Sequence, residues 1–395
     1  MPRSRPASRR CWAPTLATLA CLTTAAASRG AHADDQRVAL RAELGTEYDS
    51  NVHRREGTSG AGAAVVGSPL GRAVLGWTAT DRLAQGQDIA FSILGAAKVF
   101  AVEDARSENV GIVETSGSWR LSLNERTRLG VSGAYYEAIQ AGTRTEQQLS
   151  GEARDFRSLS PAARLVRTLG DNGTLTLGGG YRWFVYKPSR DYDFGAPVLS
   201  VEYAFNRETA DGVADWEVAV GAGVELRRFS GARLLRTSAD CTTSACTLSL
   251  DPAGTRHQDQ FSSAHLTVTR TGRVLLGAGY SIQWNRSNSY PESLVRHVGT
   301  ARFATSLPFD FYLAARAELV YVRYANPVAL LGGTSGQAYA TIEDENRSHL
   351  RAELTRDLGA RLQLVGRYSL YVNPLGGQVT YRRQTATLSL AFSID

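Results

Sequence analysis

The side chains best suited to chemistry in this 395-residue sequence are arginines and glutamates that recur at alternate positions. Glu225 and Arg227, and likewise Arg316 and Glu318, are separated by a single apolar residue. Because successive side chains of a strand point to opposite faces, both members of each pair are expected on one face. Such a face can hold anionic or hydroxyl-rich molecules, or it can neutralise itself through ordinary ion pairs, and both interpretations stay open.

The residues expected on this polar face are all charged, and each alternates with apolar or small neighbours. A charged side chain facing hydrocarbon costs about 2–4 kcal/mol at the midplane of a bilayer, so we expect these residues to face water or one another. As a set they favour a polar, water-filled interior. The predicted set is Arg41, Glu43, Arg182, Glu225, Arg227, Arg302, Arg316, Glu318, Arg351, Arg361 and Arg367.

No catalytic or metal-binding constellation is predicted. The histidines outside the first 33 residues are scattered, without metal-ligand spacing or a clear nucleophile partner. The alternative is a Ser–His pair assembled across strands, as in outer-membrane lipases, for which His265 and His349 are the first candidates. The glycine-rich segments 178–180 and 331–334 match no phosphate loop. We therefore expect neither an enzyme nor a cofactor.

These charged residues belong to long segments that alternate apolar with polar or small side chains, which is typical of strands. The segments are longer than the usual 5–6 residues of soluble strands, but they suit a tilted bilayer crossing, which needs about 9–11 residues. About sixteen strands are predicted, an even number, as bacterial barrels require. They are Val38–Tyr48, Leu70–Thr80, Asp88–Val102, Asn109–Leu123, Arg126–Ala138, Ser158–Thr168, Thr174–Lys187, Pro197–Asn206, Trp216–Phe229, Gln260–Thr269, Arg273–Asn285, Val295–Leu307, Phe309–Tyr324, Ser348–Arg356, Arg361–Val372 and Arg382–Ile394.

The connections alternate in length. Tight turns such as Leu123–Arg126 and Gly170–Gly173 alternate with longer polar stretches, including Ser50–Pro69, Ser230–Gln258 and Ala325–Arg347. Short turns on one side and long loops on the other are the signature of an outer-membrane barrel, which must close because lipid offers no partner to a free edge. The sequence therefore predicts an all-β fold, a transmembrane antiparallel up-and-down β-barrel. A soluble sandwich is the alternative.

Aromatic residues support the same fold. They share the parity of the apolar face, and most lie near a strand end, where a bilayer selects amphipathic rings. We expect these rings to form belts at the two membrane interfaces. The predicted girdle is Tyr48, Trp77, Trp119, Trp183, Trp216, Trp284 and Phe392.

Residues 1–33 have the pattern of an export signal, so we expect a signal peptide followed by a barrel domain over 34–395. An arginine-rich start precedes an apolar core and the small-x-small site Ala31–Ala33. The stretch Thr18–Cys21 faintly resembles a lipoprotein box, which is the alternative processing route. The formal charge of +6 includes five arginines in this segment and no acid. The remaining chain has no basic excess, and nucleic-acid binding is not expected.

Two cysteines remain after the signal, Cys241 and Cys246, inside the long stretch Ser230–Gln258. In an exported protein such a pair predicts one small disulfide, with two free thiols as the alternative. A metal site is not expected, because no second cysteine or histidine cluster has ligand spacing.

The first strand ends in Tyr48-Asp49-Ser50-Asn51-Val52. This ending resembles the start of Gram-negative porin-type outer-membrane barrels, several of which serve exopolysaccharide export in myxobacteria-like organisms. The last strand, with Leu388, Leu390, Phe392 and Ile394 on one face, resembles the signal read by the barrel-assembly machinery. The resemblance implies a location in the cell outer membrane, and as partners its lipid, that machinery and a periplasmic polysaccharide export protein.

The function expected from these observations is a porin-like channel that passes secreted polysaccharide across the outer membrane. Two alternatives remain: a general diffusion porin for small polar solutes, and a structural or adhesive surface barrel whose long loops bind other surfaces.

Overall fold

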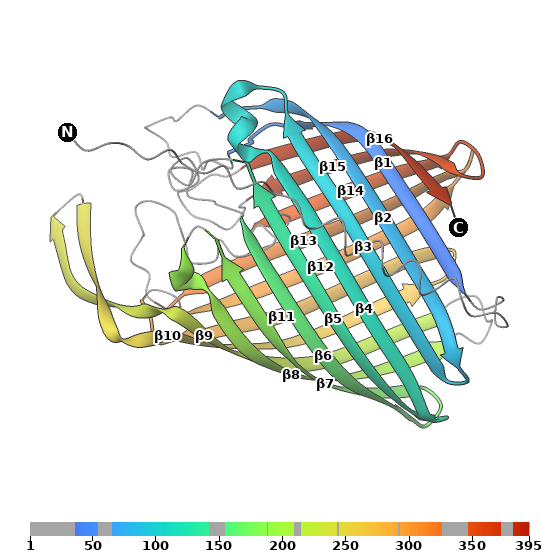
Figure 1. Cartoon of the computed structure of the whole chain (residues 1–395), viewed down its shortest axis with the longest axis horizontal. Helices are drawn as coiled ribbons and strands as arrows, with labels where there is room; N and C mark the ends of the chain where they lie inside the picture. Colours follow the sequence, from blue (N-terminus) through green and yellow to red (C-terminus); the bar gives the residue numbers. More distant parts are fainter. Residues whose placement is uncertain are drawn as a thin grey trace, which may run out of the picture.

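The structure is a computed structural model that describes residues 36–53, 65–141, 155–187, 189–208, 215–242, 245–290, 293–325, 347–372 and 382–394. Its strands form one closed antiparallel barrel (Figure 1), in which each strand pairs with its neighbours along the chain and the first pairs with the last. This confirms the predicted transmembrane β-barrel. The strands are β1 (Arg37–Asp49), β2 (Ser68–Ala84), β3 (Gln87–Phe100), β4 (Val110–Asn124), β5 (Thr127–Gln140), β6 (Phe156–Leu169), β7 (Gly173–Tyr186), β8 (Phe194–Glu208), β9 (Asp215–Thr242), β10 (Ala245–Thr271), β11 (Val274–Ser287), β12 (Leu294–Leu307), β13 (Phe311–Tyr324), β14 (Ser348–Asp357), β15 (Leu362–Val372) and β16 (Arg382–Ile394).

The two ends of the barrel differ in their connections. The short turns that follow β2, β4, β6, β10, β12 and β14 lie at one end, which we call the turn end. The opposite end, the loop end, carries the longer connections and two short 3-10 helices, η2 (Glu103–Glu108) and η3 (Arg190–Tyr192). The turn after β12 is tight enough to place Phe309 and Asp310 at positive φ, 64° and 60°. This is the two-sided arrangement that the alternating connection lengths predict.

The outer face of the barrel is apolar and exposed. Leu44, Leu199 and Leu388 are 67%, 62% and 58% exposed, and each occupies the outward parity of its strand. Large apolar residues are exposed around the whole closed sheet, and this indicates a surface that lies in lipid. Soluble proteins rarely expose so continuous an apolar patch to water. The opposite parity carries the buried acids of β1, Glu43, Glu47 and Asp49. The alternation therefore separates a membrane face from a polar interior.

The barrel closes where β1 meets β16. The register places Glu47 opposite Thr387 and Gly45 opposite Ser389. A Cβ atom at Gly45 would overlap Ser389, so the two strands approach too closely for any larger residue at this position. We call this junction the seam.

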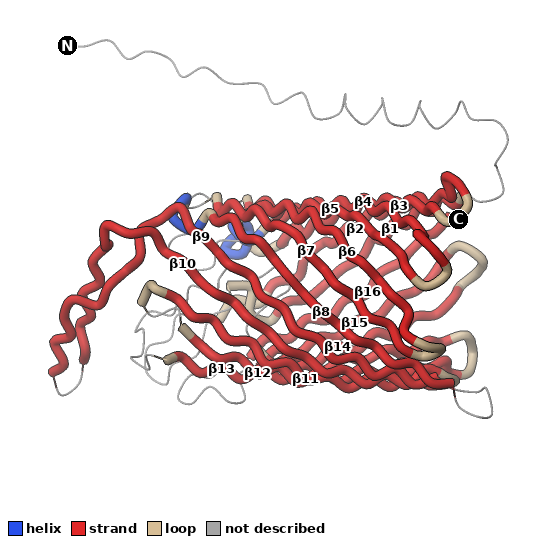
Figure 2. Tube along the Cα trace, turned by 90° about the horizontal axis from the view of Figure 1, so that it is seen from below, coloured by secondary structure: helices blue, strands red, loops and turns tan. Residues whose placement is uncertain are grey.

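The prediction of a long polar loop over Ser230–Gln258 is wrong. β9 and β10 continue as a paired hairpin to Thr242 and Ala245, and Figures 1 and 2 show this hairpin projecting from the loop end. Within the described strands, β8 pairs with β9 only as far as Phe229, and β11 pairs with β10 only from Asp259. Its high content of polar and small residues made this stretch look like a loop, although a hairpin in water can carry polar residues on both faces.

Pro161 lies inside β6, and the ladder shows its effect. On the β5 side Pro161 is opposite Gly133, but on the β7 side the pairing passes from Leu159 directly to Ala162. The gap falls at Pro161 because proline has no N–H to donate to the ladder.

Within the described residues, no helix is long and apolar enough to cross a membrane. The predicted signal peptide over 1–33 lies outside the described residues and stays a prediction.

Candidate functional site in the barrel lumen

The strand registers show which face of the barrel each predicted lumen residue occupies. Ten of them occupy inward-facing positions of their strands: Arg41, Glu43, Arg182, Glu225, Arg227, Arg302, Arg316, Glu318, Arg351 and Arg367. Arg361 differs. It lies in the turn at 358–361, before β15 begins, and its side chain is exposed at the turn end while its carbonyl accepts the Ser393 N–H at 2.9 Å. The strand starts one residue later than predicted, so Arg361 lies at the rim of the turn end, one residue before β15.

Ion pairs fill the inner face of the seam. Lys98 Nζ donates to Glu47 Oε1 at 3.0 Å, and Arg72 Nη1 lies 3.6 Å from the other oxygen of the same carboxylate. Arg367 binds Glu43 with both Nη atoms and donates from Nε to Glu353 Oε2 at 2.6 Å. Each carboxylate thus has cationic partners from neighbouring strands, which offsets the cost of its burial.

Hydroxyl groups of β16 complete the coordination of these acids. Thr387 donates to Glu47 Oε2 at 3.1 Å, and Ser389 donates to Glu43 Oε1 at 2.9 Å. Sequence reasoning did not single out Glu47 or Arg72. The parity that selects Glu43 would also have found Glu47, four residues further along the same strand.

The first-strand motif Tyr48 to Val52 forms the loop end of the seam. Asp49 is fully buried and accepts from Arg383 Nε at 3.0 Å and Nη2 at 2.6 Å. Ser50 exchanges two hydrogen bonds with the Gln384 backbone, at 3.0 and 2.8 Å. Val52, 1% exposed, packs in a buried apolar cluster with Leu70, Phe100 and Ala105. The motif therefore has a structural role in barrel closure.

A second group of charges lies on β7 and β9. Arg227 Nε donates to Glu225 Oε1 at 2.8 Å, and Arg182 Nη1 lies 3.4 Å from Glu225 Oε2. The Arg227 guanidinium also lies over the rings of Phe194 and Phe261, at 5.3 and 4.8 Å from their centroids. These contacts combine an ion pair with cation–π attraction on the lumen wall.

Three arginines lie side by side on β12, β13 and β14. The register places Arg302 opposite Arg316, and Arg316 opposite Arg351. We call these three residues the arginine row. Arg316 Nη2 donates to Glu318 Oε2 at 3.0 Å, whereas Arg351 approaches Glu353 only to 3.9 Å. Like charges directly opposite on adjacent strands destabilise a sheet, so this row needs an explanation.

A cavity of about 510 Å³ lies in the lumen between the seam and β11–β14. Cations outnumber carboxylates on its wall, and the remaining positions carry hydroxyl, amide and imidazole groups together with the apolar Phe100, Val110 and Val298. It is lined by Glu47, Arg72, Lys98, Phe100, Val110, Gln283, Arg296, Val298, Thr300, Arg316, Glu318, His349, Arg351, Arg367, Ser369, Tyr371, Arg383, Thr385 and Thr387.

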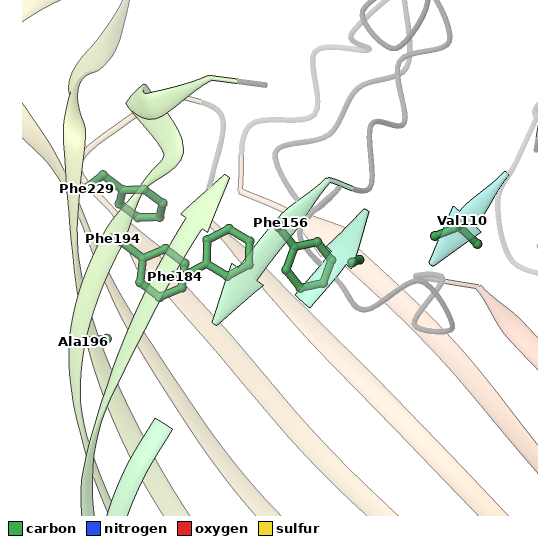
Figure 3. Close-up of a cluster of buried hydrophobic side chains, with 7 residues drawn as sticks. Val110, Phe156, Phe184, Phe194, Ala196 and Phe229 are labelled. Carbon is green, nitrogen blue, oxygen red and sulfur yellow. The ribbon is translucent and has the colours of Figure 1, made fainter. Parts of the chain in front are cut away.

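Across the lumen wall at the loop end runs an aromatic band that sequence reasoning missed. Figure 3 shows its phenylalanine rings, which come from the consecutive strands β6 to β9. The ring centroids are 5.2 Å apart for Phe156–Phe184, 5.0 Å for Phe184–Phe194 and 5.2 Å for Phe194–Phe229. Tyr136 extends the row at one end, stacked on Phe156 at 5.4 Å. These phenylalanines are 3–7% exposed. The alternation of their strands places these rings on the inner face, but sequence reasoning expected apolar rings to lie on the outer face.

The band ends on His257, which stacks on Phe229 with centroids 4.0 Å apart. His257 Nε2 lies 2.7 Å from Asp259 Oδ1 and 3.2 Å from Ser287 Oγ. A Ser–His–Asp relay uses opposite ring nitrogens, whereas here both partners meet the same nitrogen. This geometry ties the base of the hairpin to β11.

The two histidines proposed for a Ser–His pair have other contacts. His265 Nε2 lies 3.1 Å from Glu202, which it reaches past Gly221 on the strand between them; a Cβ there would fall 2.8 Å from that nitrogen. The His349 ring lies 5.7 Å from Tyr371. Among the described residues, no group of three or more His, Cys, Asp or Glu is placed to hold a metal ion.

The predicted girdle residues all occupy outward positions. Tyr48, Trp183 and Trp284 lie near the loop end of β1, β7 and β11, at 52%, 47% and 40% exposure. Trp119, Trp216 and Phe392 lie toward the turn end of β4, β9 and β16. Trp77 is further from a strand end and meets Phe91 edge-on, with centroids 5.7 Å apart.

At the outer rim of the loop end, Lys187 bridges two acids. Its Nζ lies 2.7 Å from Asp155 and 2.9 Å from Glu137. Burial alone would lower the pKa of Lys187, but hydrogen bonds to Asp155 and Glu137 raise it above its ordinary value. The preceding residue, Tyr186, packs against the aromatic band.

The register of the hairpin places Cys241 opposite Cys246, near its tip. Their side chains lie outside what the structure describes, so the disulfide stays a prediction.

Comparison with known proteins yields likenesses among solved structures alone: no family model matches the sequence, and no curated protein matches it. Among solved structures the chain is similar to OmpT of Vibrio cholerae, with 12% identity and a TM-score of 0.44 over 92% of this chain and 99% of that one. It is also similar to Pseudomonas putida OprB, with 10% identity and a TM-score of 0.46 over 91% and 94%. At such values the likeness adds nothing to what the strand topology shows.

Proposed function

We propose that this protein is an integral channel of the outer membrane that lets polar solutes cross through a hydrated, charge-lined lumen. One observation carries the proposal: a closed barrel whose outer face is apolar surrounds an inner wall of arginines and glutamates next to a cavity of about 510 Å³. A barrel of this strand number leaves room for an aqueous passage, whereas eight strands would be filled by side chains. Transport then needs no catalytic group.

Planar-bilayer recording with the folded mature protein tests this proposal. We expect stepwise currents in potassium chloride without any partner protein. Gln283→Trp, which enlarges a residue of the cavity wall, should lower the conductance. Ile282→Trp is the matched control, because the adjacent position faces outward and the added ring would meet lipid. A protein that inserts fully but never conducts would remove the channel proposal.

The finer proposal is export of a secreted polysaccharide, and it rests on the resemblance of the first strand. The motif from Tyr48 to Val52 closes the seam, a task any barrel needs, so it supports the barrel family more than the cargo. Deleting the gene and assaying surface polysaccharide tests this role. Unchanged export would leave a diffusion channel for small polar solutes.

The projecting hairpin favours a second candidate function, attachment to other surfaces. Replacing residues 236–250 with Asn-Gly would shorten the hairpin at the Leu235–Asp251 pair, where a two-residue turn can close it. An adhesive barrel should lose cell-surface binding while its conductance is unchanged. Equal binding by the shortened and full-length proteins would exclude this candidate.

A further inference from the structure

We propose that the arginine row, Arg302, Arg316 and Arg351, is a binding site for solutes that carry two or more carboxylate groups. This inference rests on the proposed channel function, since the row lines the same lumen. It goes further by naming the class of solute that the wall recognises.

The first support is the alignment of the three residues. Arg302, Arg316 and Arg351 are direct partners across β12, β13 and β14. Adjacent strands lie about 4.8 Å apart, so the backbone positions that carry the three arginines repeat at about that interval along the wall. Such an arrangement is unfavourable in an empty site, because like charges face one another. An anion bound between neighbouring guanidinium groups would remove the repulsion.

The second support is that the nearest carboxylates are already engaged. Glu353 Oε2 accepts from Arg367 Nε at 2.6 Å, and Arg351 stays 3.9 Å from the same oxygen. Glu318 accepts from Arg316 at 3.0 Å and also lies 4.0 Å from Arg296. Among the described residues Arg302 has no ion-pair partner. Few of the donors on these guanidinium groups are therefore used.

The third support is access. The side chains of Arg316 and Arg351 are 49% and 42% exposed, and both line the lumen cavity. By contrast, Arg367 on β15 and Arg383 on the seam are 9% and 7% exposed, and both bind acids. The exposed arginines are thus the ones with open donors. Thr300 and His349 on the same wall can add hydrogen bonds to a bound solute.

The chemistry of the row selects the solute class. A guanidinium presents its donors as a rigid fork that matches a carboxylate in two parallel hydrogen bonds. Two forks one strand apart suit a molecule that carries two carboxylates on a short linker. A monocarboxylate could use only one fork, and a neutral sugar would gain no charge-assisted bond.

Calorimetric titration of succinate into the folded full-length mature protein in nonionic detergent at low salt tests the site. We expect saturable binding of succinate, with acetate binding about tenfold more weakly because it engages one fork. Arg316→Gln and Arg351→Gln should each weaken succinate binding by about tenfold. Arg351→Lys should fall between, because it keeps the charge and loses the fork.

Arg182→Gln is the matched control. Arg182 is 42% exposed, as is Arg351, but it belongs to the Glu225 cluster on β7 and β9. We expect its succinate affinity to stay within about twofold of the wild type, since it lies outside the row. Heat-dependent migration on gels confirms that each variant is folded before titration.

The outcomes separate this inference from the channel proposal. No saturable heat with the folded wild type, or equal loss in Arg182→Gln and Arg351→Gln, would overturn the site. Conductance and uptake of a neutral sugar report on the channel alone. A protein that conducts but does not bind succinate would overturn the binding site and keep the channel proposal. A protein that binds succinate but does not conduct would overturn the channel proposal and keep the binding site.

Discussion

At the loop end of the barrel, two parts of the inner wall are similarly buried but are held by different forces. At the seam, Asp49 and Glu47 are bound by Arg383, Lys98 and Thr387 through directed hydrogen bonds. Along β6 to β9, phenylalanine rings pack against one another from strand to strand. One region relies on paired charges and the other on apolar surface.

The connectivity of the strands explains this difference. Ser389 and Glu43 are 346 residues apart in sequence, so no turn sets the register where β16 meets β1. A slip of one residue there would turn every side chain to the other face. Directed ion pairs with fixed geometry oppose such a slip. Phe184 and Phe194 lie on consecutive strands that residues 187–193 join directly, so the chain itself limits the register and non-directional packing suffices.

The largest expected effect comes from breaking the seam. Asp49→Ala leaves Arg383 buried without its carboxylate, and removing one partner of a buried pair costs about 3–5 kcal/mol. We expect the free energy of unfolding in detergent, measured by guanidinium titration, to fall by that amount.

The double variant Asp49→Ala, Arg383→Met should recover most of the loss, because it removes the stranded charge as well. A loss below about 1 kcal/mol in Asp49→Ala would mean that the pair is not what holds the seam.

A smaller effect is expected from the aromatic band. Phe184→Leu keeps most of the buried apolar volume but loses the ring contacts with Phe156 and Phe194. Each aromatic pair contributes about 0.5–1.5 kcal/mol beyond area, so the free energy of unfolding should fall by about 1–3 kcal/mol.

The control is Phe91→Leu, an outward ring that lipid or detergent can replace, which should cost less. Combining Phe184→Leu with Asp49→Ala should give additive losses, because the two regions share no partner. Strong non-additivity would contradict the division of the wall into two independent regions.

The smallest effect belongs to Lys187, which lies beside the band but is held by charge. Lys187→Met should lower the free energy of unfolding by about 1 kcal/mol near neutral pH. Because the folded-state pKa of Lys187 is raised, its contribution is complete below the ordinary lysine pKa of about 10.4 and is lost as pH rises through the folded value.

Unfolding titrations of the wild type and Lys187→Met from pH 8 upward test this dependence. The two curves should converge at alkaline pH. Curves that stay parallel would show that the ammonium charge of Lys187 makes no difference.

The sequence by itself determined the alternation, and with it the class of the fold. Leu362 to Val372 shows period two plainly, and that period places Arg367 inside and Tyr368 outside without any tertiary information. The turn after β12 and the long connection after β13 likewise follow from local chemistry. The same period places Glu43, Glu47 and Asp49 on the inner face of the first strand, because they share one parity.

Only the tertiary structure decided which residues meet. Parity states that Arg302, Arg316 and Arg351 face inward, but not that they align, because alignment depends on the register of three strand pairs. It also could not show that Phe184 packs inside, since an aromatic ring near a strand end suits a membrane belt equally well. Periodicity is a property of one strand, whereas register and burial are properties of neighbours, and only the closed sheet supplies those neighbours.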